Sequence, residues 1–246
     1  MADIQIFDSP ETLYAKAAEV FLESGAEALR RQGKFSVALS GGSTPLPLYR
    51  TLSKYQAANS LDWNKVHFFW GDERAVKPDH PDSNYRSVYE SLLEPRAVSM
   101  DNIHRIEGEL QPELAAHKYQ KHLLDWFGED PPRFDLILLG LGSDGHTASL
   151  FPGTHLVEPA TMAEDSWVDA LYLPHLQSWR ISFTAHLINA GSQILFIVRG
   201  SEKAGALKQV LKGSYKPQAC PAQLIQPENG RLVWLVDRDA AAELND

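Results

Sequence analysis

The sequence predicts an α/β protein with a mostly parallel sheet covered by helices on both faces. Short apolar runs rich in Val, Ile, Phe and Leu alternate along the chain with stretches of helical periodicity. The runs are continuous rather than alternating, which indicates strands buried on both faces of the sheet. No flexible linker, charge block or internal repeat interrupts the 246 residues, so we expect a single compact domain over residues 1–246.

The elements expected from these patterns follow in chain order. Strands are predicted at Ser36–Ser40, Lys65–Trp70, Asp135–Leu139 and Gln193–Val198, with two further candidates at Trp167–Leu173 and Leu232–Val236. Helices are predicted at Pro10–Arg31, Pro45–Tyr55, Ser83–Leu93, Pro112–Phe127 and Ser201–Leu211. The first helix has the plainest start signal, because Ser9 is a good N-cap and Pro10 suits the first helical position.

Composition excludes several classes of protein. The apolar fraction of 43% is ordinary for a globular domain and argues against disorder, collagen and coiled coil. No apolar run approaches the roughly 20 residues of a membrane-spanning helix, and the N-terminal residues do not resemble a signal peptide. The single Cys220 cannot form an internal disulfide, so we expect a cytoplasmic protein in which this thiol is buried or incidental.

The net charge of −9 argues against nucleic-acid binding, which needs a basic field. An anionic ligand would therefore need a local concentration of positive charge, opposite in sign to the charge of the whole chain. The His residues show no H-x-x-x-H spacing with a third ligand on a plausible helix, so no metal site is expected. The sequence does not indicate the oligomeric state.

The segment Ser40-Gly41-Gly42-Ser43-Thr44-Pro45 joins a predicted strand to a predicted helix. The glycines permit a sharp turn, and Thr44-Pro45 suits an N-cap followed by the first helical residue. A helix N-terminus with free N–H groups and hydroxyls favours a phosphate, although the dipole alone contributes only about 0.3–1 kcal/mol. The segment lacks the P-loop pattern, and an ordinary strand-to-helix turn is the alternative interpretation.

Charged residues follow the strand that ends near Trp70, in the segment Gly71-Asp72-Glu73-Arg74. The carboxyl ends of strands are where open α/β sheets bind their ligands. A solvated loop with an internal ion pair is an equally good interpretation of this segment alone.

The segment Gly140-Leu141-Gly142-Ser143-Asp144-Gly145-His146-Thr147 follows another predicted strand. It matches the dinucleotide pattern G-x-G-x-x-G, which would suit an oxidoreductase. Asp144, however, would place a carboxylate where the pyrophosphate should bind. The Asp-Gly-His order instead places an acid beside an imidazole, which suits general-base chemistry near neutral pH.

Together these motifs resemble the family of glucosamine-6-phosphate isomerases and 6-phosphogluconolactonases. The resemblance includes SGGSTP, GDER with Ser83-Asn84-Tyr85, and LGLGSDGHTASLFPG, and it extends to Trp179–Thr184 and Gly200–Ala204. It implies a Rossmann-like fold and, in the lactonase branch, hydrolysis of 6-phospho-D-glucono-1,5-lactone in the oxidative pentose phosphate pathway without a cofactor.

Two positions separate the branches of this family. The deaminases typically carry a tyrosine where this chain has Arg74 and a glutamate where it has Phe151, before Pro152. A ring-opening relay through His146 would need that glutamate to orient and charge the imidazole. The departures favour the lactonase branch. A deaminase or isomerase, a non-catalytic sugar-phosphate sensor and a dinucleotide-dependent oxidoreductase remain alternatives.

The lactonase interpretation assigns expected roles to the motif residues. His146 is the expected general base, and Arg74 the expected partner of the developing oxyanion. Asp72 could hold Arg74 or His146 in place, or bind a sugar hydroxyl. By resemblance, Arg180 and Lys203 join Ser43 and Thr44 around the phosphate. The complete set expected to bind substrate is Gly41, Gly42, Ser43, Thr44, Asn84, Asp144, Arg180 and Lys203.

Overall fold

The computed structural model describes residues 3–128, 132–158 and 166–244. Within these residues, a parallel seven-stranded sheet has the order β1-β10-β9-β6-β2-β3-β5. Its strands are β1 (Asp3–Phe7), β2 (Phe35–Leu39), β3 (Val66–Trp70), β5 (Ile103–His104), β6 (Leu136–Leu139), β9 (Gln193–Val198) and β10 (Arg231–Asp237). A small antiparallel sheet contains β4 (Asp72–Arg74), β8 (Ser178–Phe183) and β7 (Val168–Leu173). The predicted mostly parallel sheet is confirmed.

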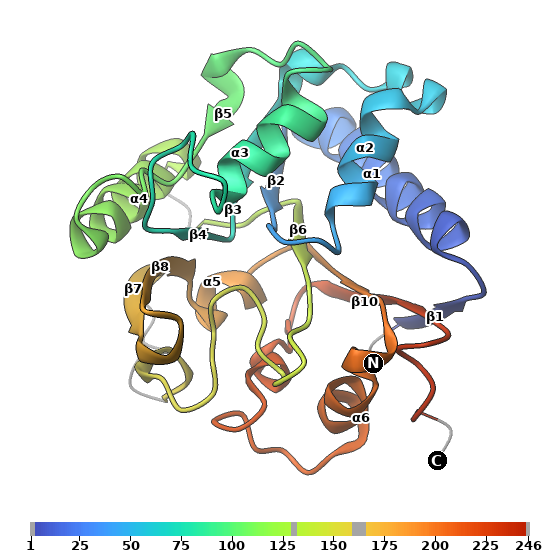
Figure 1. The fold of residues 1–246 in the computed structure, drawn as a ribbon. Coiled ribbons are helices and arrows are strands. Elements are labelled where there is room, and N and C mark those ends of the chain that lie inside the picture. Colours follow the sequence, from blue (N-terminus) through green and yellow to red (C-terminus); the bar gives the residue numbers. More distant parts are fainter. Residues whose placement is uncertain (1–2, 129–131, 159–165, 245–246) are drawn as a thin grey trace.

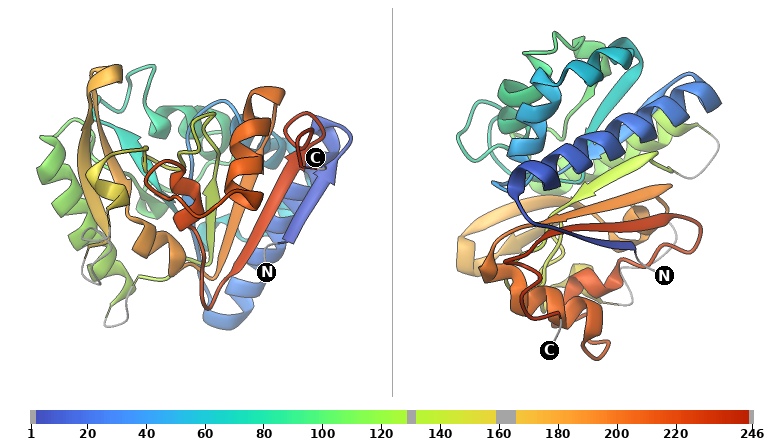
Figure 2. Two further views of the ribbon diagram at one scale, coloured as in Figure 1. Left: turned by 90° about the horizontal axis from the view of Figure 1, so that it is seen from below. Right: turned by 90° about the vertical axis from the view of Figure 1, so that its right-hand side faces the viewer.

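Helices cover both faces of the large sheet, as predicted. The helices are α1 (Pro10–Gln32), α2 (Leu46–Lys54), α3 (Asn84–Val88), α4 (Pro112–Phe127), α5 (Ala185–Asn189) and α6 (Ala204–Lys212). Helices α1, α2 and α3 lie on one side of the sheet, and α5 and α6 lie on the other (Figure 1). Figure 2 shows α1 running across one face with α6 opposite, and α4 packs against β7 and β8.

In the described part of the chain, no helix is long and apolar enough to cross a membrane.

The first helix begins and ends where its sequence signals predict. Ser9 is extended and its hydroxyl accepts a hydrogen bond from the backbone N–H of Thr12 at 3.3 Å. The helix ends at Gly33, which has a φ of +76° and donates its N–H to the Leu29 carbonyl. The helix packs its apolar face on the sheet, with the Phe21 ring edge-on to that of Phe35.

Two differences from the predicted sheet stand out. The strands β1, β4, β5 and β8 were not predicted, and the strand predicted at Trp167–Leu173 is β7 (Val168–Leu173) of the small sheet rather than part of the parallel one. Strand β1 is short and lies at an exposed edge of the sheet. Its sequence therefore lacks the continuous apolar pattern of the inner strands. Strand β8 contains Arg180 and pairs with β4, which is more than 100 residues earlier in the chain.

The predicted helix boundaries needed three corrections. The N-cap of α2 is Pro45 rather than Thr44, and the Pro45 side chain forms no capping hydrogen bond to a described residue. The α-helical part of Ser83–Leu93 stops at Val88 and continues as a π-helical turn. The α-helix predicted from Ser201 begins at Ala204, after a 3-10 turn over Ser201–Lys203. Such shifts are common because the first and last turns of helices adopt tighter or wider hydrogen bonding.

The order of the strands positions the ligand-binding edge. From β2 the chain proceeds to β3 on one side, and later returns to place β6 on the other side. The crevice beyond the carboxyl ends of β2 and β6 is the topological switch point, where open α/β sheets bind ligands. The segments that follow β2, β3, β6 and β9 therefore meet at one edge, and they include all three motifs.

A row of three histidines links β3 and β5 to α4. Nδ1 of His67 lies 3.1 Å from Nε2 of His104, and Nδ1 of His104 lies 2.9 Å from Nε2 of His122. Phe69 stacks on His104, with a distance of 4.3 Å between ring centroids. Burial lowers the pKa of all three imidazoles, and the neighbouring histidines add to this effect for His104, whose pKa is about 3.

We expect this row to make the fold sensitive to acid. Below the ordinary histidine pKa of 6.5, the unfolded chain binds protons that the folded chain excludes, so stability falls as the pH drops from about 6.5 to 4.5. One pKa unit corresponds to about 1.4 kcal/mol, and partial exposure reduces the effect, so we expect a loss on the order of 2 kcal/mol. Urea unfolding across this range measures it. A His104→Phe variant should show a shallower pH dependence, and an identical slope in both proteins would contradict the explanation.

Candidate active site

A cavity of about 200 Å³ lies at the carboxyl edge of the large sheet, where the three motifs meet. The lining includes most of the residues predicted for the site, namely Gly41, Gly42, Ser43, Thr44, Asp72, Arg74, Asn84, His146 and Lys203. Asp144 and Arg180 do not line the cavity, but each is adjacent to a residue that does. The structure therefore brings together segments that are more than 160 residues apart in the chain.

The turn after β2 presents unused hydrogen-bond donors to this cavity. None of the backbone N–H groups of residues 41–44 donates to another residue that the structure describes, and neither hydroxyl of Ser43 or Thr44 is bonded there. Gly42 has a φ of +92°, which favours glycine. A Cβ atom at Gly41 would lie 1.7 Å from Oδ1 of Asn84, so this position has no room for a side chain. The turn thus has the geometry expected of an anion site.

Two tyrosines that the sequence analysis missed hold this turn in place. The hydroxyl of Tyr49 donates to the Ser40 carbonyl at 2.6 Å and accepts from the Ser40 N–H at 3.1 Å. The hydroxyl of Tyr14 donates to the Thr44 carbonyl at 2.7 Å. Both residues lie on apolar helix faces, where the sequence pattern indicates only core packing.

His146 is oriented by Asp144, as the Asp-Gly-His order predicts. Its Nδ1 lies 2.5 Å from Oδ1 of Asp144, and its ring stacks on Phe151 with 4.1 Å between centroids. Burial by itself raises the pKa of Asp144, but the hydrogen bond and charge of His146 outweigh it and hold this pKa at about 2. Asp144 is therefore ionised at neutral pH. Because Nδ1 is occupied, Nε2 is the ring nitrogen that can accept a proton from a bound molecule.

Glycines and the single cysteine pack closely around this pair. A Cβ at Gly142 would lie 2.0 Å from Nδ1 of His146, and one at Gly145 would lie 2.7 Å from Sγ of Cys220. Gly145 also has a φ of +82°. Cys220 is 3% exposed, which confirms the expectation of a buried thiol, and burial raises its pKa. It packs behind the Asp144–His146 turn.

Asp72 is buried at the floor of the cavity. Asn84 donates its amide to the Asp72 carbonyl at 2.9 Å and, more weakly, to Oδ1 at 3.4 Å. Among the described residues, neither Arg74 nor His146 forms a hydrogen bond or ion pair with the Asp72 carboxylate. Of the three expected roles, binding a sugar hydroxyl is the one that these contacts leave open.

Glu73 is a structural residue that the sequence analysis missed. It is 2% exposed, and its carboxylate accepts hydrogen bonds from the backbone N–H groups of Arg74, Asn84 and Tyr85 and from the Ser83 hydroxyl. Burial raises the pKa of Glu73, and these backbone N–H groups oppose the shift. The contacts tie the start of α3 to β4 and so fix Asn84. The only sequence signal for this role of Glu73 was the helix N-cap residue Ser83, which follows the GDER segment and donates to Glu73.

Two arginines lie opposite each other on neighbouring strands. Arg74 and Arg180 are cross-strand partners in β4 and β8, and the charge of Arg74 adds to burial in lowering the pKa of Arg180. Nη1 of Arg74 donates to the Asp82 carbonyl at 2.6 Å, whereas its Nε is buried with no hydrogen-bond partner in the described ranges. Arg180 donates to the Ser178 hydroxyl and the Trp179 carbonyl. Like charges in this position are unfavourable unless an anion lies near them.

Lys203 enters the cavity from the turn that follows β9. No residue in the described ranges forms an ion pair with it. The charged residues of the lining are therefore the cations Arg74 and Lys203 and the anion Asp72, a balance opposite in sign to that of the whole chain.

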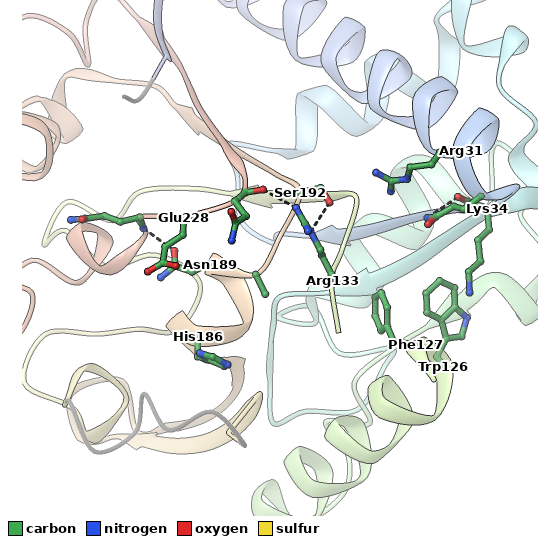
Figure 3. Close-up of a pocket in the computed structure, with 13 residues that line it drawn as sticks. Arg31, Lys34, Trp126, Phe127, Arg133, His186, Asn189, Ser192 and Glu228 are labelled. Atoms are coloured by element: carbon green, nitrogen blue, oxygen red, sulfur yellow. Dashed lines mark hydrogen bonds between the residues drawn. The ribbon is translucent and has the colours of Figure 1, made fainter. Parts of the chain in front are cut away.

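A larger cavity of about 1000 Å³ lies at the opposite, amino edge of the sheet (Figure 3). Several of its polar groups already have partners, since Arg133 donates to the Ser192 hydroxyl and the Asn229 carbonyl, and Arg31 pairs with Asp135, which is not part of the lining. Lys34 lies over the ring of Trp126, with 3.7 Å from its Nζ to the ring centroid. None of the predicted site residues lines this cavity. The chemistry of the side chains, rather than cavity size, identifies the carboxyl edge as the candidate site.

Comparison with known proteins agrees with this geometry. The sequence profile of the glucosamine-6-phosphate isomerases/6-phosphogluconolactonase family matches residues 8–234. The chain belongs to this family.

Several relatives show which branch the chain resembles. A 6-phosphogluconolactonase from Nostoc sp. is 40% identical over an alignment 248 residues long, gaps included, which covers 98% of each chain. The structure of 6-phosphogluconolactonase from Trypanosoma brucei superimposes with a TM-score of 0.86 and 26% identity over 99% of each chain. A monomeric glucosamine-6-phosphate deaminase shares the fold, with a TM-score of 0.81 over 98% of this chain and 99% of that one, at 21% identity.

Within the family, the two positions at which the chain departs from the expected deaminase pattern both belong to the site. Arg74 lines the cavity, and Phe151 packs on the face of the His146 ring. An apolar ring in that position supplies no carboxylate to charge the imidazole.

Proposed function

We propose that this protein hydrolyses 6-phospho-D-glucono-1,5-lactone to 6-phospho-D-gluconate without a cofactor, as the second step of the oxidative pentose phosphate pathway. The observation that carries the proposal is the Asp144–His146 pair beside a turn whose N–H groups donate to no residue that the structure describes, in a chain 40% identical to a named 6-phosphogluconolactonase. The cavity thus combines a base with an anion-binding turn, which are the two elements that a phosphorylated lactone requires.

In the proposed mechanism, His146 acts as the general base. With Nδ1 bound to Asp144, Nε2 takes a proton from water as the water oxygen attacks the lactone carbonyl carbon. Arg74, from the cavity wall, stabilises the negative charge that develops on the carbonyl oxygen. Collapse of the tetrahedral intermediate breaks the bond to the ring oxygen, and the proton held by His146 passes to that oxygen.

The substrate phosphate is assigned to the turn after β2 and the nearby cations. The N–H groups of Gly41, Gly42, Ser43 and Thr44 and the ammonium of Lys203 lie around the same cavity. Arg180 would reach the phosphate from β8 by exchanging its bond to Ser178 for a bidentate contact. Asp72 and Asn84 are assigned to the sugar hydroxyls.

We place the enzyme in the cytoplasm, on the basis of its single cysteine. Its proposed partner is a small sugar-phosphate lactone rather than nucleic acid or a membrane. We treat residues 1–246 as one functional domain, because both sheets contribute residues to the same cavity.

Three substrates test the function. We expect rapid hydrolysis of the 6-phosphorylated lactone, at least about 100-fold lower kcat/KM for unphosphorylated gluconolactone, and no ammonia from glucosamine 6-phosphate. The phosphorylated substrate gains from the turn and from Lys203, which the plain lactone cannot engage. A coupled assay corrected for spontaneous lactone opening measures the first two rates.

Each result has a clear contrary outcome. Equal kcat/KM on the two lactones would remove Lys203, Arg180 and the β2 turn from phosphate recognition. Release of ammonia would place the protein in the deaminase branch. Binding of the phosphorylated sugar without turnover would make it a sensor.

A further inference from the structure

Ser149 connects the loop that carries His146 to the buried Asp72. Its hydroxyl donates to Oδ2 of Asp72 at 2.7 Å. Ser149 is 1% exposed and Asp72 is 8% exposed, so this hydrogen bond is shielded from water. The bond joins two segments that are 77 residues apart, and it is the shortest contact that the Asp72 carboxylate makes in the described part of the chain.

The backbone between His146 and Ser149 is shaped to make this contact. Ala148 has a φ of +46°, a left-handed conformation that is unfavourable for a residue with a Cβ. The hydroxyl of Thr147 donates to the Gly140 carbonyl at 2.8 Å, and a bridge joins Thr147 to Leu150. The strained turn reverses the chain so that His146 lines the cavity while Ser149 is buried beneath it.

The contact makes the two oxygens of Asp72 different. Oδ2 is occupied by the Ser149 hydroxyl, whereas among the residues that the structure describes Oδ1 has only the 3.4 Å contact with the amide of Asn84. Oδ1 is therefore the oxygen available to a sugar hydroxyl. A carboxylate held by one short hydrogen bond cannot rotate freely, and a displacement of about 1 Å at a reacting group can cost about 100-fold in rate.

We infer that Ser149 is a positioning residue of this active site, which orients the Asp72 carboxylate toward the substrate and holds it in register with His146. The inference rests on the proposed function, in which Asp72 binds a sugar hydroxyl. Ser149 itself is buried behind Asp72 and acts through it.

Ser182 offers a matched control in the same loop contact. Its hydroxyl accepts a hydrogen bond from the backbone N–H of Ser149 at 3.2 Å and donates to the Phe183 carbonyl. It is fully buried and faces Asp72 across the strand pair, but no hydrogen bond joins its side chain to that carboxylate within the described ranges. Ser182→Ala therefore weakens the docking of the loop while leaving the Ser149–Asp72 bond intact.

The experiment compares Ser149→Ala with Ser182→Ala in the lactone assay. We expect Ser149→Ala to lower kcat about 10- to 100-fold with KM changed less than threefold. Ser182→Ala should lower the Tm by a similar amount but change kcat less than threefold. Ser149→Cys keeps a similar side-chain size and a weak hydrogen-bond donor, so we expect an intermediate kcat. If Ser149→Ala does not fold, the kcat of Ser149→Cys is compared with that of Ser182→Ala instead.

A double-mutant cycle tests whether Ser149 acts through Asp72. In an Asp72→Asn background, adding Ser149→Ala should change kcat less than twofold. A full additional loss there, or equal losses of kcat in Ser149→Ala and Ser182→Ala, would overturn the inference, as would full activity of Asp72→Asn. Absence of lactone turnover in the unmodified protein would instead overturn the proposed function, so the two failures are distinguishable.

Discussion

Replacing His146 by alanine is expected to lower kcat for the phosphorylated lactone by about 10²–10⁴-fold. The side chain is the only imidazole among the described residues that line the cavity, and its free Nε2 is the proposed acceptor of the water proton. Loss of the base leaves the oxyanion partner and the phosphate-binding turn in place, so KM should change little. The measurement is the initial rate of hydrolysis with the spontaneous rate subtracted.

His117→Ala provides the comparison for this variant. His117 is exposed on α4 and does not line the cavity, so its loss should leave kcat and KM within twofold of the unmodified protein. Equal Tm values for the two variants would show that the loss at His146 is not a folding defect. A decrease in kcat of less than tenfold for His146→Ala would contradict the role of general base.

Gly142→Ala is expected to have the second-largest effect, lowering kcat by about 100-fold or more. The added Cβ would lie 2.0 Å from Nδ1 of His146 and 2.6 Å from Oδ1 of Asp144, far inside van der Waals contact. One or both side chains must then shift, and we expect the shift to break their 2.5 Å contact. Displacing a catalytic group by about 1 Å can cost about 100-fold in rate. Steady-state kinetics of the purified variant measures this loss.

The control for Gly142→Ala adds the same methyl group where space exists. At Gly71, just outside the cavity, the nearest atom to a new Cβ is the Leu39 carbonyl oxygen at 3.7 Å, an ordinary contact. We therefore expect Gly71→Ala to keep kcat within threefold. If Gly142→Ala also stayed within threefold, the Asp144–His146 contact would not be needed for the reaction.

The parts of the fold that could be predicted depend on neighbouring residues in the chain. The first helix has its signals at both ends, in Ser9 and Gly33, and each signal acts on backbone groups within one turn. The inner strand β2 is buried at every position and has a continuous apolar sequence. The small sheet was missed because β4 and β8 pair across more than 100 residues, and neither strand has the pattern of a buried strand.

The candidate site could be predicted in outline because most of its motifs are short stretches of neighbouring residues. Asp144 and His146 are two residues apart, so their contact is determined by a single turn. The position of Arg180 was harder to predict from the sequence, because the contacts of a strand residue depend on which strand pairs with its own. Asn84 was expected to bind substrate, and the structure adds that its amide bonds to Asp72 while its Oδ1 packs against Gly41.

The sequence by itself determined the fold class, the family resemblance and the motifs of the site, because caps, turns and apolar runs act over a few residues. Only the tertiary structure decided that Ser149 bonds to Asp72, that Glu73 anchors α3, and that Arg74 and Lys203 reach the cavity. The Ser149–Asp72 bond joins residues 77 apart in the chain, the Glu73–Asn84 bond joins two separate elements 11 residues apart, and Arg74 and Lys203 reach the cavity from different parts of the fold. Such contacts depend on strand order and on the packing of side chains, which no short stretch of sequence encodes.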